Sequence, residues 1–282
     1  MNNKIKIFII IFFTFIVNAF LYGQIKKGTV SQLMAFTKTT TVFVENEMYP
    51  KYNEAIKEYV PKFWKITPYK FISRAELDKY IINKQYSFVI ISEVTIKNSK
   101  GTQNYIYLNT LLGGKPKLNN LTDIGSFPIA DSEDDEDVFV PKIGALIKML
   151  QYHLKTSIEH PDMEYDKLLK YYNKNSKKIK DMELLITKDN LNADIEDINK
   201  IKQIYPYKVR IVSNNEIKKA IDNEESNTVF FHNVFPKKID NGNQYWKMVI
   251  SVSDGTIYYI VNEKYSVNSP EKLTSKDLKK FK

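Results

Sequence analysis

The sequence predicts an α/β protein of two tandem βαβαββ modules with mixed parallel and antiparallel sheets, arising by internal duplication. The first observation is a helix start that occurs twice, as SRAELDKYI from Ser73 and as SNNEIKKAI from Ser213. In both, glutamate follows serine by three residues, which is the capping box that bonds free backbone amides of the first helical turn. Apolar residues then recur at spacings of three and four, which indicates one buried helical face.

The second observation is that strand-like runs surround the repeated helix in the same order in both halves. The shared order of strand, capped helix, strand and strand indicates a duplicated unit. The runs are PYKFI (68–72), FVII (88–91) and YIYLN from Tyr105 in the first half, and PYKVRIV (206–212), TVFF (228–231) and YWKMVISV from Tyr245 in the second.

Each unit extends towards the amino terminus by one more strand and one more helix. The strands are TTTVFVE (39–45) and MELLITK (182–188). We expect Pro61 to end the first helix, because an interior proline removes an amide and clashes with the preceding turn. The apolar helix faces are Tyr52, Ala55, Ile56, Tyr59 and Val60 in the first half, and Ile195, Ile198, Ile201 and Ile204 in the second.

The alternation of strands and helices, the third observation, predicts right-handed crossovers and a parallel core in each sheet. The unbroken apolar run FVII is typical of a strand covered on both faces. The last strands of the second half are expected to be antiparallel, because Asp254 and Gly255 between two strands are a strong hairpin signal.

The halves differ after these strands. The first runs from LLGG through an expected loop to the acidic DSEDDED (131–137) and then to a third helix. We divide the chain into a signal peptide (1–23), a first module with an extra carboxyl-terminal helix (24–160), a helical connector (161–180) and a second module with a basic tail (181–282). The apolar face of the third helix is Ile143, Leu146, Ile147, Leu150 and Leu154.

The amino terminus has the pattern of a secretory signal peptide. Lys4 and Lys6 precede an apolar run, and cleavage is expected between Gly23 and Gln24. Its length also approaches that of a membrane span, so an uncleaved anchor is the alternative. Cleavage predicts an exported protein, periplasmic or extracellular.

Composition restricts the chemistry. The chain has no cysteine, which removes disulfides, thiolate nucleophiles and cysteine metal sites. Apolar residues make up 43% and charged residues 27%, so the chain can bury an ordinary core. A secreted protein without disulfides must be held together by that core.

The positive charge is concentrated in the connector and the tail. Removal of Lys4 and Lys6 lowers the formal charge from +9 to +7. Residues 163–180 hold six lysines and two acids, and residues 272–282 hold five lysines and one acid. A nucleic-acid surface would interleave basic and aromatic residues on a folded face, so we expect no nucleic-acid partner. Weak attraction to acidic glycans or lipid headgroups, including peripheral membrane contact, fits better.

The candidate chemical residues are few. Asp131, Glu133, Asp135 and Asp137 alternate as in a calcium loop, but Glu136 occupies the position of the required glycine. An acidic loop before a helix is the preferred interpretation, because negative charge stabilises a helix amino terminus.

The three histidines form no metal pattern either. His153 and His160 could share a helical face, but no H-E-x-x-H motif accompanies them. His232 ends a buried strand, where α/β sheets often hold functional groups, although a structural role is preferred. Its counterpart 140 residues earlier is Ser92. No phosphate loop or nucleophile elbow occurs. We therefore assign no catalytic, cofactor-binding or metal-binding residue.

The runs YSFVIISEVTI…YIYLNTLLGG and TVFFHNVF…YWKMVISVSDGTIYYIV resemble the carboxyl half of TolB amino-terminal-type domains. In that family a capped helix precedes a buried strand and a hairpin. The resemblance implies a small envelope domain that binds other proteins and has no active site. No β-propeller repeats follow, and the resemblance supplies no functional residues.

Two functional hypotheses follow. The first is an exported, non-catalytic binding or structural protein of the bacterial envelope, whose partner is a protein or an anionic envelope polymer. The second is a secreted hydrolase with a site in the cleft between the modules, using acids and His232. A deep polar pocket with two close carboxylates would favour the hydrolase, whereas a seam filled by tyrosine and phenylalanine would favour the binding protein. The oligomeric state stays open.

Overall fold

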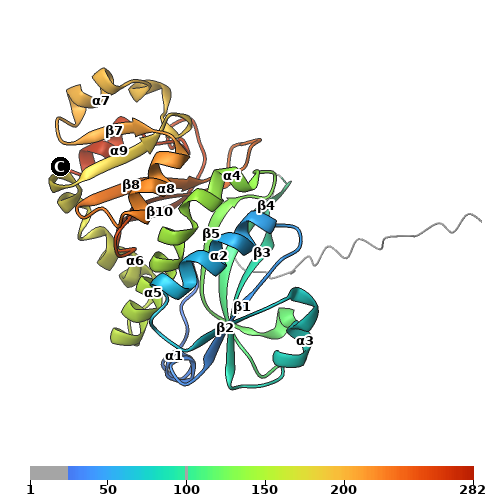
Figure 1. Ribbon diagram of the computed structural model, residues 1–282. Helices are drawn as coiled ribbons and strands as arrows, with labels where there is room; N and C mark the ends of the chain where they lie inside the picture. Colours follow the sequence, from blue (N-terminus) through green and yellow to red (C-terminus); the bar gives the residue numbers. More distant parts are fainter. Residues whose placement is uncertain (1–24, 99–100) are drawn as a thin grey trace, which may run out of the picture.

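The computed structural model describes residues 25–98 and 101–282, so the expected cleavage site at Gly23 and Gln24 lies outside the described residues. Two five-stranded sheets form, in the orders β2-β1-β3-β4-β5 and β7-β6-β8-β9-β10 (Figure 1). The strands are β1 Thr40–Val44, β2 Tyr69–Ile72, β3 Tyr86–Asn98, β4 Gly101–Leu112, β5 Thr122–Asp131, β6 Glu183–Thr187, β7 Val209–Val212, β8 Thr228–Val234, β9 Gln244–Ser251 and β10 Ile257–Lys264.

The two sheets have the same pairing pattern. In each, the first three strands are parallel and the last three run antiparallel to one another. The protein is therefore a mixed α/β protein of two similar modules, consistent with internal duplication. The helices are α1 Val30–Phe36, α2 Pro50–Phe63, α3 Leu77–Tyr80, α4 Glu136–Phe139, α5 Ile143–Glu159, α6 Tyr165–Asn173, α7 Ile198–Ile204, α8 Asn214–Asp222 and α9 Ser275–Lys280, with 3₁₀ turns at η1 Arg74–Glu76, η2 Leu118–Asn120, η3 Val140–Lys142, η4 Ser176–Asp181, η5 Lys188–Asn190 and η6 Ala193–Ile195.

The duplicated capping box forms in both modules. The Ser73 amide donates to Glu76 Oε2 at 3.0 Å, and the Ser213 amide donates to Glu216 Oε2 at 2.8 Å. Leu77, one residue after Glu76, is buried, as is its equivalent in α8, Ile217. The first copy continues as a 3₁₀ turn and the short α3, whereas the second is a regular helix.

Three local expectations were wrong. Helix α2 continues past Pro61 to Phe63, because a proline in the last turn removes only one hydrogen bond and Val60 O still accepts from the Trp64 amide at 3.0 Å. Ile198, expected on the buried face of α7, is 36% exposed. The turn that contains Asp254 and joins β9 to β10 spans residues 252–256, whereas a two-residue hairpin turn was expected.

The segment expected to be a loop before the acidic residues forms the edge strand β5. Gly125 and Pro128 hide its alternation in the sequence, but Ile124, Phe127 and Ile129 are buried. Pro128 lies opposite Tyr107 beside a register shift, and an edge strand tolerates proline because it has a free side.

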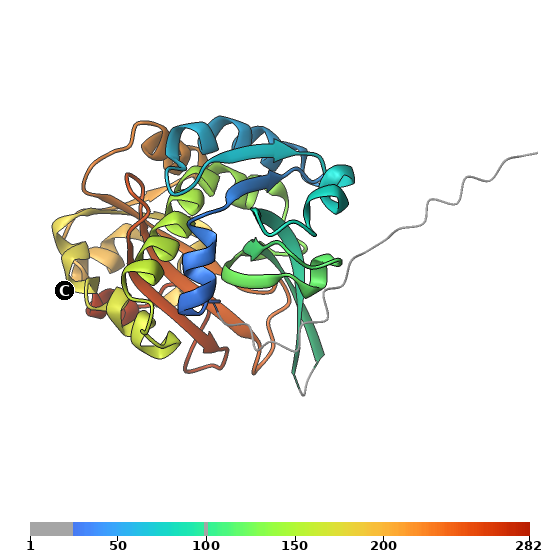
Figure 2. The same cartoon turned by 90° about the horizontal axis from the view of Figure 1, so that it is seen from below.

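Helix α5 lies between the two sheets and joins the modules (Figures 1 and 2). One apolar cluster includes Phe43 and Val89 of the first sheet, Leu150 of α5, and Phe230 and Ile250 of the second sheet. Helices α2 and α8 contribute to the same cluster from either module. The modules therefore share a continuous core, while α3 covers the outer face of the first sheet and α7 and α9 cover the outer face of the second.

Candidate functional site

The structure places His232, a candidate from the sequence, at the seam between the modules, together with charged residues that were not singled out from the sequence. His232, near the end of β8, is 1% exposed, and Lys142 of η3 is 4% exposed. Burial, and then the charge of Lys142, lower the pKa of His232 well below its ordinary 6.5. Burial lowers the pKa of Lys142 to about 8, against the opposing charges of Asp134 and Asp189. We call these four residues the seam cluster.

His232 replaces an apolar residue of the first module. Strand pairing aligns Val42 with Phe88 in the first sheet and Leu185 with Phe230 in the second. Two residues further along, Ile90 is therefore the structural counterpart of His232, and the expected match to Ser92 was wrong. The offset between modules grows from 140 to 142 because the second capped helix and its loop are longer.

The seam cluster lacks the geometry of a general base. Neither ring nitrogen of His232 has a hydrogen-bond partner among the residues that the structure describes. A catalytic imidazole needs a partner that fixes its tautomer and a path to substrate, and neither is provided at 1% exposure. His232 acts here as a buried neutral ring.

Aromatic and aliphatic side chains pack together in other parts of the seam. The Trp246 ring meets Tyr105 edge-on at 5.0 Å and Tyr107 at 6.1 Å between centroids. Elsewhere in the seam, the Tyr59 hydroxyl of α2 in the first module donates to Asp222 of α8 in the second at 2.5 Å. These contacts are of the kind expected for the binding-protein hypothesis.

A buried lysine adds a charged link across the seam. The Lys148 ammonium of α5 donates to Val252 O at 3.1 Å and lies 3.1 Å from Glu224 Oε2. It also lies 3.7 Å from the centre of the Phe63 ring. Burial lowers the pKa of Lys148 despite the bond to Glu224. The lysine therefore joins both modules through one side chain.

The carboxylates of the acidic loop accept hydrogen bonds from backbone amides. Glu136 accepts from the amides of Lys51 and Tyr52 at 3.3 and 2.8 Å, so it caps the amino terminus of α2. Asp134 accepts from the amide of Asp131 at 3.0 Å. Across the described part of the chain, no group of three or more histidine, aspartate or glutamate residues is arranged to hold a metal ion.

The other two histidines lie in different surroundings. His153 Nδ1 lies 2.9 Å from the Tyr172 hydroxyl, and its Nε2 lies 2.8 Å from Lys26 O. Burial lowers the pKa of His153 to about 4. His160 follows the last residue of α5, and its ring contacts Tyr171. The structure gives the two rings separate partners.

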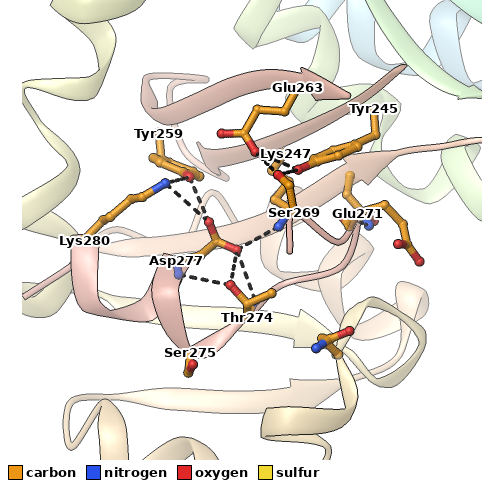
Figure 3. A network of polar contacts seen from close by, with 12 residues as sticks. Tyr245, Lys247, Tyr259, Glu263, Ser269, Glu271, Thr274, Ser275, Asp277 and Lys280 are labelled. Carbon is orange, nitrogen blue, oxygen red and sulfur yellow. Dashed lines mark hydrogen bonds and ion pairs between the residues drawn. The ribbon is translucent and has the colours of Figure 1, made fainter. Parts of the chain in front are cut away.

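A second polar cluster, which the sequence did not predict, fixes α9 to the outer face of the second sheet (Figure 3). Lys247 of β9 and Asp277 of α9 form an ion pair at 2.8 Å, with side chains 4% and 6% exposed. Asp277 also accepts from the hydroxyls of Tyr259 and Thr274 at 2.9 Å each. Lys280 donates to the Tyr259 hydroxyl at 2.8 Å. We call these five residues the α9 network.

The pKa shifts in the α9 network favour the protonation states that hold α9 to the sheet. Burial, and then the charge of Asp277, raise the pKa of Tyr259, so its phenol stays protonated and donates. Burial alone would raise the pKa of Asp277, but Lys247 and the hydroxyl donors outweigh it and lower that pKa. Neither group is therefore activated as a base or nucleophile at neutral pH.

The sequence did contain two signals for this network. Thr274 and Asp277 have capping-box spacing, and Lys247 interrupts the apolar run YWKMVISV. The sequence predicted only a basic tail at the end of the chain, but Leu278 and Phe281 are fully buried. Helix α9 was missed because Leu278 and Phe281, which are three residues apart, stand among lysines.

Fold and sites define a two-module α/β protein whose buried polar groups hold elements together. Comparison with known protein families, with curated proteins and with solved structures finds no match in any of the three. Within residues 25–98 and 101–282, no helix has the length and apolar character required to cross a bilayer.

Proposed function

We propose that the protein is an exported, non-catalytic binding or structural protein of the bacterial envelope. The observation that carries the proposal is the seam, which aromatic and apolar side chains fill where a cleft enzyme would bind substrate. The buried titratable residues support it further, because His232 has no hydrogen-bond partner among the described residues and Tyr259 donates to Asp277. The analogy with TolB amino-terminal-type domains is consistent with such a role.

Cell fractionation followed by mass spectrometry tests the export. We expect the chain in the periplasmic or extracellular fraction, beginning at Gln24 after loss of residues 1–23. Recovery of the chain with residues 1–23 in the membrane fraction would support the anchor instead.

A hydrolase assay tests the alternative function. We expect no turnover of chromogenic ester, glycoside, phosphate or peptide substrates above that of a heat-denatured sample. Turnover that disappears in His232→Leu would replace the binding hypothesis with a seam hydrolase, because His232 is the buried imidazole of that seam.

A further inference from the structure

Two lysine-rich segments that are distant in sequence meet on the second module. Residues 167–180 and 272–282 together contain eleven lysines. Ile179 of η4 lies in the same apolar cluster as Leu278 and Phe281 of α9. The carboxyl terminus also lies close to the connector in both views (Figures 1 and 2).

Consecutive residues of the edge strand β10 hold both segments. The backbone amide and carbonyl of Ile260 bond to the Asn173 side chain at 2.8 Å each, which fixes the end of α6 against this edge. The neighbouring Tyr259 hydroxyl bonds to Asp277 and Lys280 of α9. The lysines that follow Asn173 and those around Lys280 are therefore placed by adjacent positions of one strand.

Lysines outnumber acids on this surface, although Asp166 is next to Lys167, Asp181 is next to Lys180 and Glu271 is next to Lys272 in the chain. Asp277, the acid of the tail, is buried against Lys247, so its charge is matched from inside the sheet. Lys167 pairs with Glu164 at 3.4 Å and Lys280 lies 3.6 Å from Asp277. The other nine lysines make no ion pair with any residue that the structure describes. Glu263, whose charge also reaches Lys280, accepts hydrogen bonds from Tyr245 and Ser269.

We infer that the lysines of residues 167–180 and 272–282 form one surface, the lysine surface, that binds a phosphate-bearing polymer of the envelope. The inference rests on the proposed function and names its partner. Both segments contain lysine and no arginine. Lysine binds phosphate as a point charge, and arginine, of which the chain has only two, would offer bidentate contacts to carboxylate and phosphate alike. A chain of repeating charges also matches a row of lysines better than a single small anion does.

A bilayer surface fits less well than a soluble polymer. Membrane-bound surfaces combine basic residues with apolar side chains that enter the headgroup region. The large apolar side chains that the structure shows as exposed lie outside both segments, at Val30, Met34, Met48, Tyr69, Ile82, Val138, Ile198 and Val267.

The test compares two variants of equal charge, made in the chain of residues 24–282. The surface variant replaces Lys174, Lys177, Lys279 and Lys282 by glutamine, and all four are exposed. The control variant makes the same change at four exposed lysines of the first module, which are Lys38, Lys84, Lys115 and Lys117. Fluorescence anisotropy measures binding of long-chain inorganic polyphosphate across a salt series, and polygalacturonate and phosphatidylglycerol vesicles are the comparison probes.

We expect the surface variant to lose polyphosphate affinity by about tenfold or more at low salt, with a shallower salt dependence, while the control variant binds like the original chain. A Lys→Arg variant at the same four surface positions should keep its affinity, which separates loss of charge from loss of folding. Equal losses in both glutamine variants, or binding to polygalacturonate or vesicles without polyphosphate, would overturn the inference. Failure of export would overturn the envelope assignment alone, because polyphosphate binding is measured on purified protein.

Discussion

His232 occupies a position where the two modules differ in chemistry. Its counterpart Ile90 is a buried apolar side chain, whereas His232 brings into the seam, next to Lys142, two ring nitrogens that bond to no residue in the described part of the chain. A buried polar group without a partner lowers stability, and protonation would add a second charge beside the lysine. The seam should therefore weaken in acid.

We expect the buried histidines to lower the free energy of unfolding as the pH falls below 6.5. Both have depressed pKa values in the folded state, so the unfolded chain binds more protons in this range and stability is lost on acidification. For His153, a pKa lowered from 6.5 to about 4 corresponds to a loss of about 2 kcal/mol between pH 8 and pH 5.

Urea unfolding of His232→Leu from pH 8 to pH 5 measures how much of the acid-induced loss of stability is due to His232. Burial raises the pKa of Asp123 to about 6, which acts in the opposite direction, so the informative quantity is the difference between the two profiles. The variant should lose less stability on acidification than the original chain. Ile90→Leu, at the counterpart position, should change stability without changing the pH profile. Parallel profiles for His232→Leu and the original chain would show that His232 does not titrate in this range.

At this scale the sequence indicated which residues were unusual but not where they meet. Residues 131–137 lack the glycine of a calcium loop, and Glu136, which stands in its place, caps α2. The pair formed by Lys247 and Asp277 was missed, because thirty residues separate its members and only the packed sheet brings them to 2.8 Å.

At the scale of elements, the repeated capping box begins the second crossover helix of each module. Ser73→Ala or Ser213→Ala should each reduce the free energy of unfolding by about 0.5–2 kcal/mol, through loss of the cap. Leu77→Ala should cost about 2–5 kcal/mol, because it also leaves a cavity under α3. Chemical denaturation measures all three, with Asn215→Ala in the exposed first turn of α8 as the control. If the serine variants lost no more free energy of unfolding than Asn215→Ala, the capping box would not contribute to stability.

The turn between β9 and β10 packs closely against the backbone of α5 at Gly255. Gly255 has a φ of +74°, and a Cβ at this position would lie 2.2 Å from the Lys148 carbonyl carbon. We expect Gly255→Ala to cost about 2–5 kcal/mol, from backbone strain and overpacking together. Gly242→Ala is the matched control, since its φ is +89° but nothing lies within 4 Å of an added Cβ. Thermal unfolding that shows equal losses for the two variants would mean that the contact with α5 is unimportant.

The elements that the sequence predicted well are those with strong local signals. Both capping boxes and the alternation of strands and helices formed as expected, because these features depend on neighbours in the chain. Strand β5 did not follow from the sequence, since its pairing with β4 tolerates Gly125 and Pro128 at the sheet edge. Helix α9 was hidden by lysines that surround Leu278 and Phe281.

At the scale of the whole molecule, the sequence predicted two modules but not how closely they join. Only one apolar face of α5 was recognised, and that face suits packing on a single sheet. The opposite side carries Ala145, Met149 and Thr156, and Gly144 lies between the two faces; all four are also buried. Small residues allow close approach without strong hydrophobicity, so a pattern of apolar residues does not reveal a helix enclosed between two sheets.

The shared core predicts that both modules unfold together. Phe43, Leu150 and Phe230 belong to one apolar cluster, so unfolding either module would expose α5 and the facing sheet of the other. The chain has two tryptophans, and both are buried, Trp64 in the first module and Trp246 in the second. Trp246→Phe leaves Trp64, which reports on the first module, and Trp64→Phe leaves Trp246, which reports on the second module and on its contact with Tyr105 and Tyr107 across the seam.

Within each variant, we expect the fluorescence midpoint in urea to coincide with the midpoint from far-ultraviolet circular dichroism, which reports on the whole chain. Comparing two probes on the same variant removes the effect of the substitution itself on stability. If the modules were independent, Trp64 and Trp246 would report separate transitions, and circular dichroism would show both. That result would reduce α5 to a helix of the first module that rests against a separately folded second one.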